Sequence, residues 1–175
     1  MAVRLAIIVP YRDRPDHLRQ FVPHMRRYLR DAKLTEYTIH VVEQSFGKPF
    51  NRGAVKNIGF KLADPCADYV CFHDVDYLPI KADYSWVDCP TLLISKGTIL
   101  TENMNTFFGA VVAFSKTDFT KINGYPNAYW QWGFEDQELH ERCILTGLTI
   151  KRREGVFHAL PHVHEGLKPD GTEAE

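Results

Sequence analysis

The segment DYVCFHDVD, residues 68–76, joins a short apolar run to two aspartates, and the fold follows from it and its surroundings. An apolar run of this length, bounded by polar residues, predicts a buried β-strand. Two similar runs precede it, RLAIIVP at 4–10 and YTIHVVEQ at 37–44. Between them, residues 11–32 carry apolar side chains at helical spacing, and residues 51–65 are expected to form a second helix that ends before Pro65. This β-α-β-α-β order predicts an α/β fold with a Rossmann-like, mostly parallel sheet flanked by helices.

The second half of the chain is expected to add shorter elements to the same single domain, since no repeat or linker interrupts the sequence. Residues 77–105 are irregular, with one short strand near TLLIS. The other expected elements are a strand at 107–115, a helix capped by Ser115, a helix from 135 to 147 with Leu139, Cys143 and Leu145 inward, and strands at 149–153 and 155–160. Pro23 is expected to kink or break the first helix.

The composition is that of an ordinary globular protein of 175 residues, with 45% hydrophobic residues and a formal net charge of −1. Because there is no basic excess, nucleic acid is not expected as a partner. The apolar run LAIIVP is too short for a transmembrane segment or an export signal, so we expect a cytoplasmic protein. The four cysteines form no C-x-x-C pair and are expected to be free thiols.

Ligands of open parallel sheets bind beyond the carboxyl ends of the strands. Residues 10–14, 44–52 and 74–79 should therefore converge on one crevice. Asp74 and Asp76 are two residues apart, so both carboxylates can face the same ligand if the strand continues through them. A metal site, a substrate site, an acid/base pair and a hydrogen-bonded turn all remain open for this pair.

A second pair of polar residues, His162 and His164 in PHVHEG, lies near the end of the chain. Their spacing lets both imidazoles face one side of an extended segment, which is a frequent metal chelate, although a single histidine is more often an ordinary surface or core residue. A carboxylate together with imidazoles suits Mn²⁺ or Zn²⁺, and phosphate oxygens in the same shell would favour Mn²⁺.

Carboxylates and aromatic residues meet in the segment WGFEDQE, residues 132–138. Glu135 and Asp136 begin a helix, where the helix dipole alone explains a preference for negative charge. The functional alternative is that Trp130 and Trp132 stack on a sugar ring, so that a carboxylate beside them accepts a proton from a sugar hydroxyl.

Three arginines, Arg12, Arg14 and Arg52, follow the first strand and begin the second helix. They could hold a phosphate together with the helix N-terminus, or they could be ordinary surface arginines. The chain has no G-x-G-x-x-G segment, Walker loop or nucleophile elbow, which argues against NAD enzymes, ATPases and hydrolases.

Five segments, taken in order, resemble the motif series of the β-1,4-galactosyltransferase family: IIVPYRDRPDHL, FNRGAVKNIGF, FHDVDYLP, FFGAVVAFSKTDFTKINGYPNAYWQWGFEDQEL and HVH. The resemblance covers most of residues 5–164, and the H-x-H ending is most like the xylosylprotein galactosyltransferase branch. It implies an inverting, metal-dependent enzyme of the GT-A fold that uses a UDP-sugar. The single domain over 1–175 would have a nucleotide-binding half at about 1–80 and an acceptor and metal half at about 105–165.

The resemblance also implies a role for each matching residue. The nucleotide would contact Pro10, Tyr11, Arg12, Arg14, Phe50, Asn51, Arg52, Asp74 and Val75. Mn²⁺ would be bound by Asp76, His162 and His164. The donor sugar and the acceptor would contact Trp132, Glu135, Gly109 and Phe107. Asp136 would be the catalytic base, which takes the proton of the acceptor hydroxyl as that oxygen attacks the anomeric carbon.

The chain departs from the family pattern at two places. Where the family has two glycines after an aromatic pair, this chain has Gly109 and Ala110 after Phe107 and Phe108. A tyrosine at the position of Phe107 favours galactose in the family, and smaller residues admit N-acetylgalactosamine, so galactose is the expected donor sugar. Only Glu165 and ten further residues follow His164, so the family's long closing loop is expected to be short or absent.

The resemblance thus predicts transfer of galactose from UDP-galactose to a hydroxyl of a glycan or glycoside acceptor, with a β-1,4 linkage. Two alternatives stay within the same site: a UDP-N-acetylgalactosamine transferase, and a UDP-sugar-binding module without catalysis. A nucleotidyltransferase could share the sheet and the metal-binding aspartates, but the chain has no glycine-rich triphosphate loop.

Overall fold

β1 (Leu5–Tyr11) lies inside the sheet, and all seven of its residues are buried. β2 (Tyr37–Glu43) and β3 (Tyr69–His73) pair with it on either side, both in parallel, so that Ile8 lies between His40 and Phe72. Strands buried on both faces are typical of parallel sheets covered by helices. The apolar segments at 4–10, 37–44 and 68–76 therefore form the strands predicted for them.

The structure is a computed structural model that describes residues 3–95, 106–131 and 133–161. The remaining elements are α1 (Pro15–Asp31), α2 (Arg52–Leu62), β4 (Tyr77–Lys81), β5 (Thr91–Leu92), β6 (Val111–Ser115), α3 (Lys116–Lys121), α4 (Glu135–Leu145), β7 (Lys151–Arg152) and β8 (Val156–Ala159). The main sheet has the order β2-β1-β3-β6-β5-β7, and β4 pairs with β8 in a separate two-stranded sheet. One sheet therefore contains strands from both halves of the chain.

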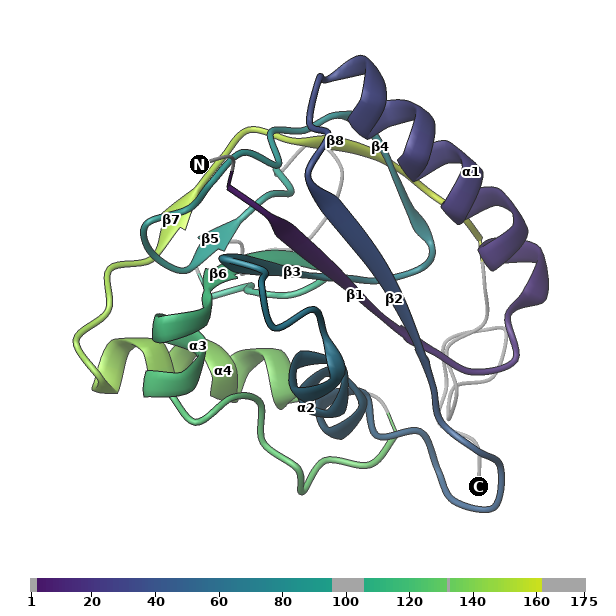
Figure 1. The fold of residues 1–175 in the computed structure, drawn as a ribbon. Helices are drawn as coiled ribbons and strands as arrows, with labels where there is room; N and C mark the ends of the chain where they lie inside the picture. Colours follow the sequence, from purple (N-terminus) through teal and green to yellow (C-terminus); the bar gives the residue numbers. More distant parts are fainter. Residues whose placement is uncertain (1–2, 96–105, 132, 162–175) are drawn as a thin grey trace.

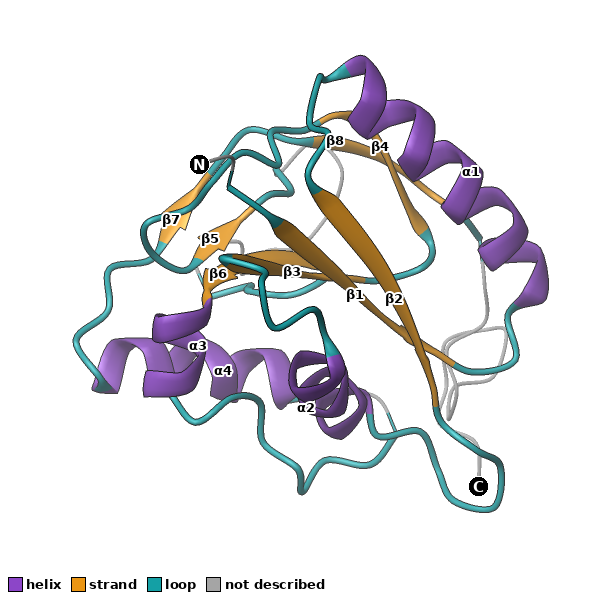
Figure 2. Ribbon diagram, viewed as in Figure 1, coloured by secondary structure: helices purple, strands orange, loops and turns teal. Residues whose placement is uncertain are grey.

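The helices cover the sheet on both faces (Figure 1). α1 and the β4–β8 pair lie on one side, and α2, α3 and α4 lie on the other, with the strands between them in Figure 2. Phe21, Met25 and Leu29 of α1 are fully buried against the core. None of the described helices combines the length and the apolar character needed to cross a membrane.

Several sequence predictions differ from the structure. The helix over 11–32 is continuous through Pro23, which is exposed, because three buried apolar side chains outweigh the cost of about 3 kcal/mol for an interior proline. The strand predicted at 107–115 begins only at Val111, since Ala110 has a φ of +59° and cannot continue an extended strand. Leu145 is 83% exposed, because it lies two residues from buried Cys143 and so on the opposite face of α4.

Other predictions are confirmed with adjusted limits. Ser115 caps α3 by accepting a hydrogen bond from the Asp118 N–H at 3.0 Å. The two last strands are present as β7 and β8, shorter than predicted. All four cysteines are free. The antiparallel pairing of β6 with β3, and the strand β4, were not predicted, because the choice of a strand's partner does not show in its own sequence.

Candidate active site

The carboxyl ends of the first strands converge, as predicted. Beyond β1, the Arg12 guanidinium donates to the Lys48 carbonyl at 2.7 Å and lies 5.2 Å from the centre of the Phe50 ring. Beyond β3, Asp74 lies beside the first turn of α2, where Arg52 Nη1 donates to its Oδ2 at 3.0 Å. The segments after all three parallel strands thus meet at one edge of the sheet.

Five charged side chains form a cluster at this edge, here called the charged cluster: Arg52, Lys56, Asp74, Glu135 and Asp136. Arg52 contacts Asp74 and also Glu135, with its Nε 2.6 Å from Oε1. Lys56 Nζ lies 3.5 Å from Asp136 Oδ1 and 3.9 Å from Asp74 Oδ1. Two cations and three carboxylates from α2, α4 and the end of β3 are therefore held together in a largely buried place.

The local sequence explains how α2 delivers both cations to the cluster. Arg52 and Lys56 are four residues apart in a helix, so their side chains lie on the same face. The helix starts at a fixed place because the Asn51 side chain accepts a hydrogen bond from the Ala54 N–H at 2.8 Å. Asn51 also donates to the Asn127 carbonyl at 2.8 Å and is almost completely buried. In the described structure Asn51 thus holds the helix and the 123–131 loop together, and its contact with a nucleotide stays a prediction.

The two oxygens of the Asp136 carboxylate have different neighbours. Its Oδ1 faces Lys56, and its Oδ2 lies so close to Gly109 that a Cβ atom there would come within 2.2 Å of it. Burial raises the pKa of Asp136, while the charges of Lys56 and Arg52 act in the opposite direction. A mostly buried carboxylate with a raised pKa, packed against a glycine that has no side chain to displace it, is suited to accept a proton.

Glu135, next to it, has a different environment. Its side chain is 3% exposed and forms an ion pair with Arg52. Burial disfavours the charge of Arg52, but Asp74, Asp136 and Glu135 raise its pKa, so it remains a cation. The structure therefore places Glu135 and Arg52 together inside the cluster, and the assignment of Glu135 to the acceptor stays a prediction.

The backbone that leads into α4 is unusual. Phe134, the N-cap residue, has a φ of 68° in the left-handed region, and Gly133 before it has a φ of 111°. A left-handed conformation is costly for a residue with a side chain, and such residues gather at functional sites. This turn directs Glu135 and Asp136 inward, while the Phe134 ring is largely exposed. Trp132 lies outside the described residues.

Asp76 lies immediately before β4 and two residues after Asp74. Its side chain is among the buried polar ones, and its carbonyl accepts a hydrogen bond from the Leu160 N–H at 2.7 Å. Because β8 pairs with β4, the described chain arrives beside Asp76 at Leu160 and Pro161. His162 and His164 lie outside the described residues. Within the part of the chain that is described, no group of three or more His, Cys, Asp and Glu side chains is placed so that it could hold a metal ion.

The other predicted nucleotide and sugar contacts lie around this edge. Tyr11 ends β1, and its hydroxyl accepts a hydrogen bond from the Arg14 N–H at 3.2 Å. Pro10 and Val75 are buried. Phe107 is half-buried, with its ring 3.3 Å from the place of a Cβ on Gly109. Their contacts with a donor stay predictions.

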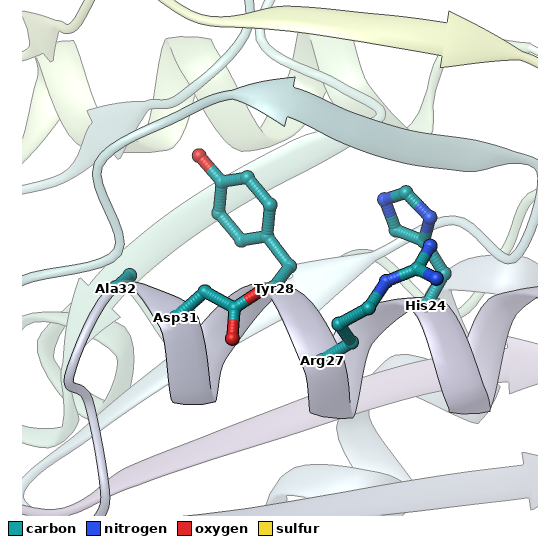
Figure 3. Close-up of a pocket in the computed structure, with 5 residues that line it drawn as sticks. All are labelled: His24, Arg27, Tyr28, Asp31 and Ala32. Carbon is teal, nitrogen blue, oxygen red and sulfur yellow. The ribbon is translucent and has the colours of Figure 1, made fainter.

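A hollow of about 380 Å³ lies away from this edge, along the last turns of α1. Figure 3 shows its lining, which is His24, Arg27, Tyr28 and Asp31 of that helix and Ala32 directly after it. The Tyr28 hydroxyl donates to the Ala82 carbonyl at 2.8 Å and accepts from the Ala82 N–H, and His24 Nε2 donates to the Pro79 carbonyl. These side chains hold β4 and the segment after it on α1, so their role is structural.

Sequence reasoning missed Lys56. A lysine in a helix is usually exposed, and no role in the site was therefore predicted for Lys56. The signal that could have found it is its spacing from Arg52, because a residue four positions along the helix shares the face that the arginine presents to the crevice.

The comparisons with known proteins agree with this geometry. Residues 1–90 match the family model described as the N-terminal region of glycosyl transferase group 7, and residues 98–165 match that described as the N-terminal domain of galactosyltransferase. Human (Homo sapiens) β-1,4-galactosyltransferase 6 is 37% identical over 173 residues, which cover 93% of this chain and 45% of the relative. The chain thus spans about half the length of the curated relatives it matches.

Two crystal structures of a Drosophila relative have the same fold. The catalytic domain of its β-1,4-galactosyltransferase 7, in complex with xylobiose, is 32% identical, with a TM-score of 0.81. A mutant of that enzyme in complex with manganese, UDP-Gal and xylobiose is 31% identical, with a TM-score of 0.83. Each match covers 93% of this chain and 71% of the neighbour. The resemblance seen in the motifs is confirmed, and the chain belongs to the β-1,4-galactosyltransferase family, glycosyltransferase group 7, with a GT-A fold.

Proposed function

We propose that this chain transfers galactose from UDP-galactose to a hydroxyl of a sugar acceptor, with inversion at the anomeric carbon and with Mn²⁺ as cofactor. The observation that carries the proposal is the placement of Asp136, whose mostly buried carboxylate lies beside Lys56 and packs directly against Gly109. The Drosophila relative crystallised with manganese, UDP-Gal and xylobiose supports the choice of donor, metal and a xylose-containing acceptor.

The residues present fit a manganese ion. Asp76 offers a carboxylate at the edge where the strands end, and the chain reaches it through Leu160 and Pro161 immediately before the H-V-H segment. One carboxylate and two imidazoles form a ligand set that Mn²⁺ accepts together with phosphate oxygens. Asp76, His162 and His164 would hold the ion. When bound, it would neutralise the negative charge that develops on the departing diphosphate.

The chain's own part in the reaction is the transfer of one proton. Asp136 accepts the proton of the acceptor hydroxyl as that oxygen forms its bond to the anomeric carbon. The bond from that carbon to the UDP oxygen breaks on the opposite face, and UDP leaves with the electron pair. Such a positioned base contributes about a hundred- to ten-thousand-fold in rate.

The test is a transfer assay with Mn²⁺, UDP-galactose and acceptors ending in xylose, N-acetylglucosamine or glucose, followed by the Asp136→Asn variant. We expect turnover with the wild type and a fall in kcat of about 10²- to 10⁴-fold in the variant, with UDP affinity unchanged. Glu141→Gln is the matched control, because Glu141 lies on the exposed side of the same helix.

Normal turnover by the Asp136→Asn variant would refute the role of Asp136. Binding of UDP and Mn²⁺ by the wild type without transfer or hydrolysis of any UDP-sugar would instead favour a binding module without catalysis. Preference for UDP-N-acetylgalactosamine over UDP-galactose would correct the donor and leave the mechanism in place.

A further inference from the structure

Lys56 is a buried lysine at the centre of the charged cluster. It is 1% exposed, in the middle of α2, so its side chain cannot extend to the solvent. Its Nζ also lies 4.6 Å from the centre of the Tyr125 ring, which is itself buried and packed edge-on against Phe72 at 5.1 Å. The ammonium is thereby held in one place by an aromatic face and two carboxylates.

The charged groups around Asp136 come from every element packed against it. On α2 these are Arg52 and Lys56, and on its own helix α4 it is Glu135. From the end of β3 comes Asp74, and beside the cluster is the Tyr125 phenol. Of the two cations, Lys56 forms the ion pair with the Asp136 carboxylate, whereas Arg52 forms ion pairs with Asp74 and Glu135.

A second feature of the geometry is that the two oxygens of Asp136 have different neighbours. Oδ1 is 3.5 Å from Lys56 Nζ and has no hydrogen-bond partner among the described residues. Oδ2 faces Gly109. A fixed cation beside one oxygen therefore holds the carboxylate in one orientation, with its other oxygen packed against Gly109.

We propose that Lys56 is a positioning residue for Asp136, which keeps that carboxylate ionised and turned toward Gly109 in the state that accepts a proton. The inference rests on the proposed function, because it assigns Lys56 a part in the same proton transfer. Through its contact with Asp74, Lys56 also joins the base on α4 to the end of β3, next to the predicted nucleotide contacts. Burial alone would raise the pKa of Asp136, and the neighbouring ammonium opposes that effect.

The experiment compares the pH dependence of kcat/KM for galactose transfer in the wild type, Lys56→Met, Lys56→Arg and Lys61→Met, at saturating Mn²⁺. Methionine keeps the length of the side chain without its charge. Removal of a cation in contact with a carboxylate raises the carboxyl pKa by about one to three units, so the acidic limb of the Lys56→Met profile should move upward by that amount. Activity should return at higher pH, and Lys56→Arg should keep the wild-type limb. Lys61, on the exposed side of α2, is the matched control and should change nothing.

A merely structural Lys56 would lower the melting temperature without moving the limb, and an unmoved limb in folded Lys56→Met protein would overturn the inference. If Lys56→Met does not fold, the double variant with Asp136→Asn should recover folding, because the uncompensated charge is then removed. Failure of that recovery would also overturn it. An inactive wild type would count against the proposed function itself, whereas an active wild type with an unmoved limb would count only against the role of Lys56.

Discussion

Substitution of His73 should remove a large part of the pH dependence of stability. His73 ends β3 and is completely buried, with its ring stacked on Tyr84 at 5.9 Å. Its Nδ1 lies 2.9 Å from the Asp74 carbonyl and its Nε2 lies 2.7 Å from the Tyr84 hydroxyl. The carbonyl can only accept, so Nδ1 carries the proton and Nε2 accepts from Tyr84. The neutral ring is therefore fully hydrogen-bonded.

The magnitude follows from the difference in pKa between the two states. Burial lowers the pKa of His73 from 6.5 to about 4 in the folded protein. The unfolded chain therefore binds more protons between these values, and stability falls as the pH falls through this window. The stabilisation is complete above about pH 6.5. This difference in proton binding lowers the free energy of unfolding by about 2 kcal/mol between pH 8 and pH 5, and by about 3 kcal/mol in total below pH 4.

Urea denaturation of the wild type and His73→Gln, from pH 8 to pH 5, measures this difference directly. His73→Gln should be less stable than the wild type at pH 8, because the ring contacts are lost. Between pH 8 and pH 5, however, its free energy of unfolding should decrease by about 2 kcal/mol less than that of the wild type. His158→Gln, at an exposed position of β8, is the control and should follow the wild type. Parallel curves for the wild type and His73→Gln would refute a neutral, buried His73, since all other groups titrate alike in both.

Two further predictions concern the backbone beside Asp136. Gly109→Ala should lower kcat by about a hundredfold or more without unfolding the protein, because the new methyl group would occupy the place of Asp136 Oδ2 and displace it. Wild-type kcat in this variant, measured alongside its circular dichroism, would contradict the close approach. Ala110→Gly should stabilise the protein by about 0.5–1 kcal/mol, because relief of the left-handed φ of +59° exceeds the added entropy of the unfolded chain. A lower midpoint of urea denaturation would contradict it.

The first half of the fold could be predicted because its information is local. β1, β2 and β3 are short apolar runs, α1 carries apolar side chains at helical spacing, and α2 ends shortly before Pro65. The pairing of β6 with β3 and of β4 with β8 could not be predicted, since these contacts join segments far apart in the chain.

The candidate site could also be predicted only in part. The carboxyl ends of parallel strands predict where the crevice lies, and the contact between Arg52 and Asp74 confirms that α2 and β3 meet there. The partners of each charge could not be predicted. Arg52, for which a nucleotide contact stays a prediction, lies between Asp74 and Glu135, because three buried carboxylates need nearby cations. Lys56 was not predicted to be part of the site, because lysine is rarely buried.

The pairing of β4 with β8 has a consequence for the order in which the molecule forms. β1, β2 and β3 come from the first 73 residues and pair with one another, so the centre of the sheet can form early during synthesis. β4 follows directly, but its partner β8 begins only at Val156. Until β8 has been synthesised and has left the ribosome, β4 has no partner strand, and an unpaired strand edge can cause aggregation. The pairing of β8 with β4 brings the Leu160 N–H to the Asp76 carbonyl, so the surroundings of the proposed metal ligand Asp76 are completed last.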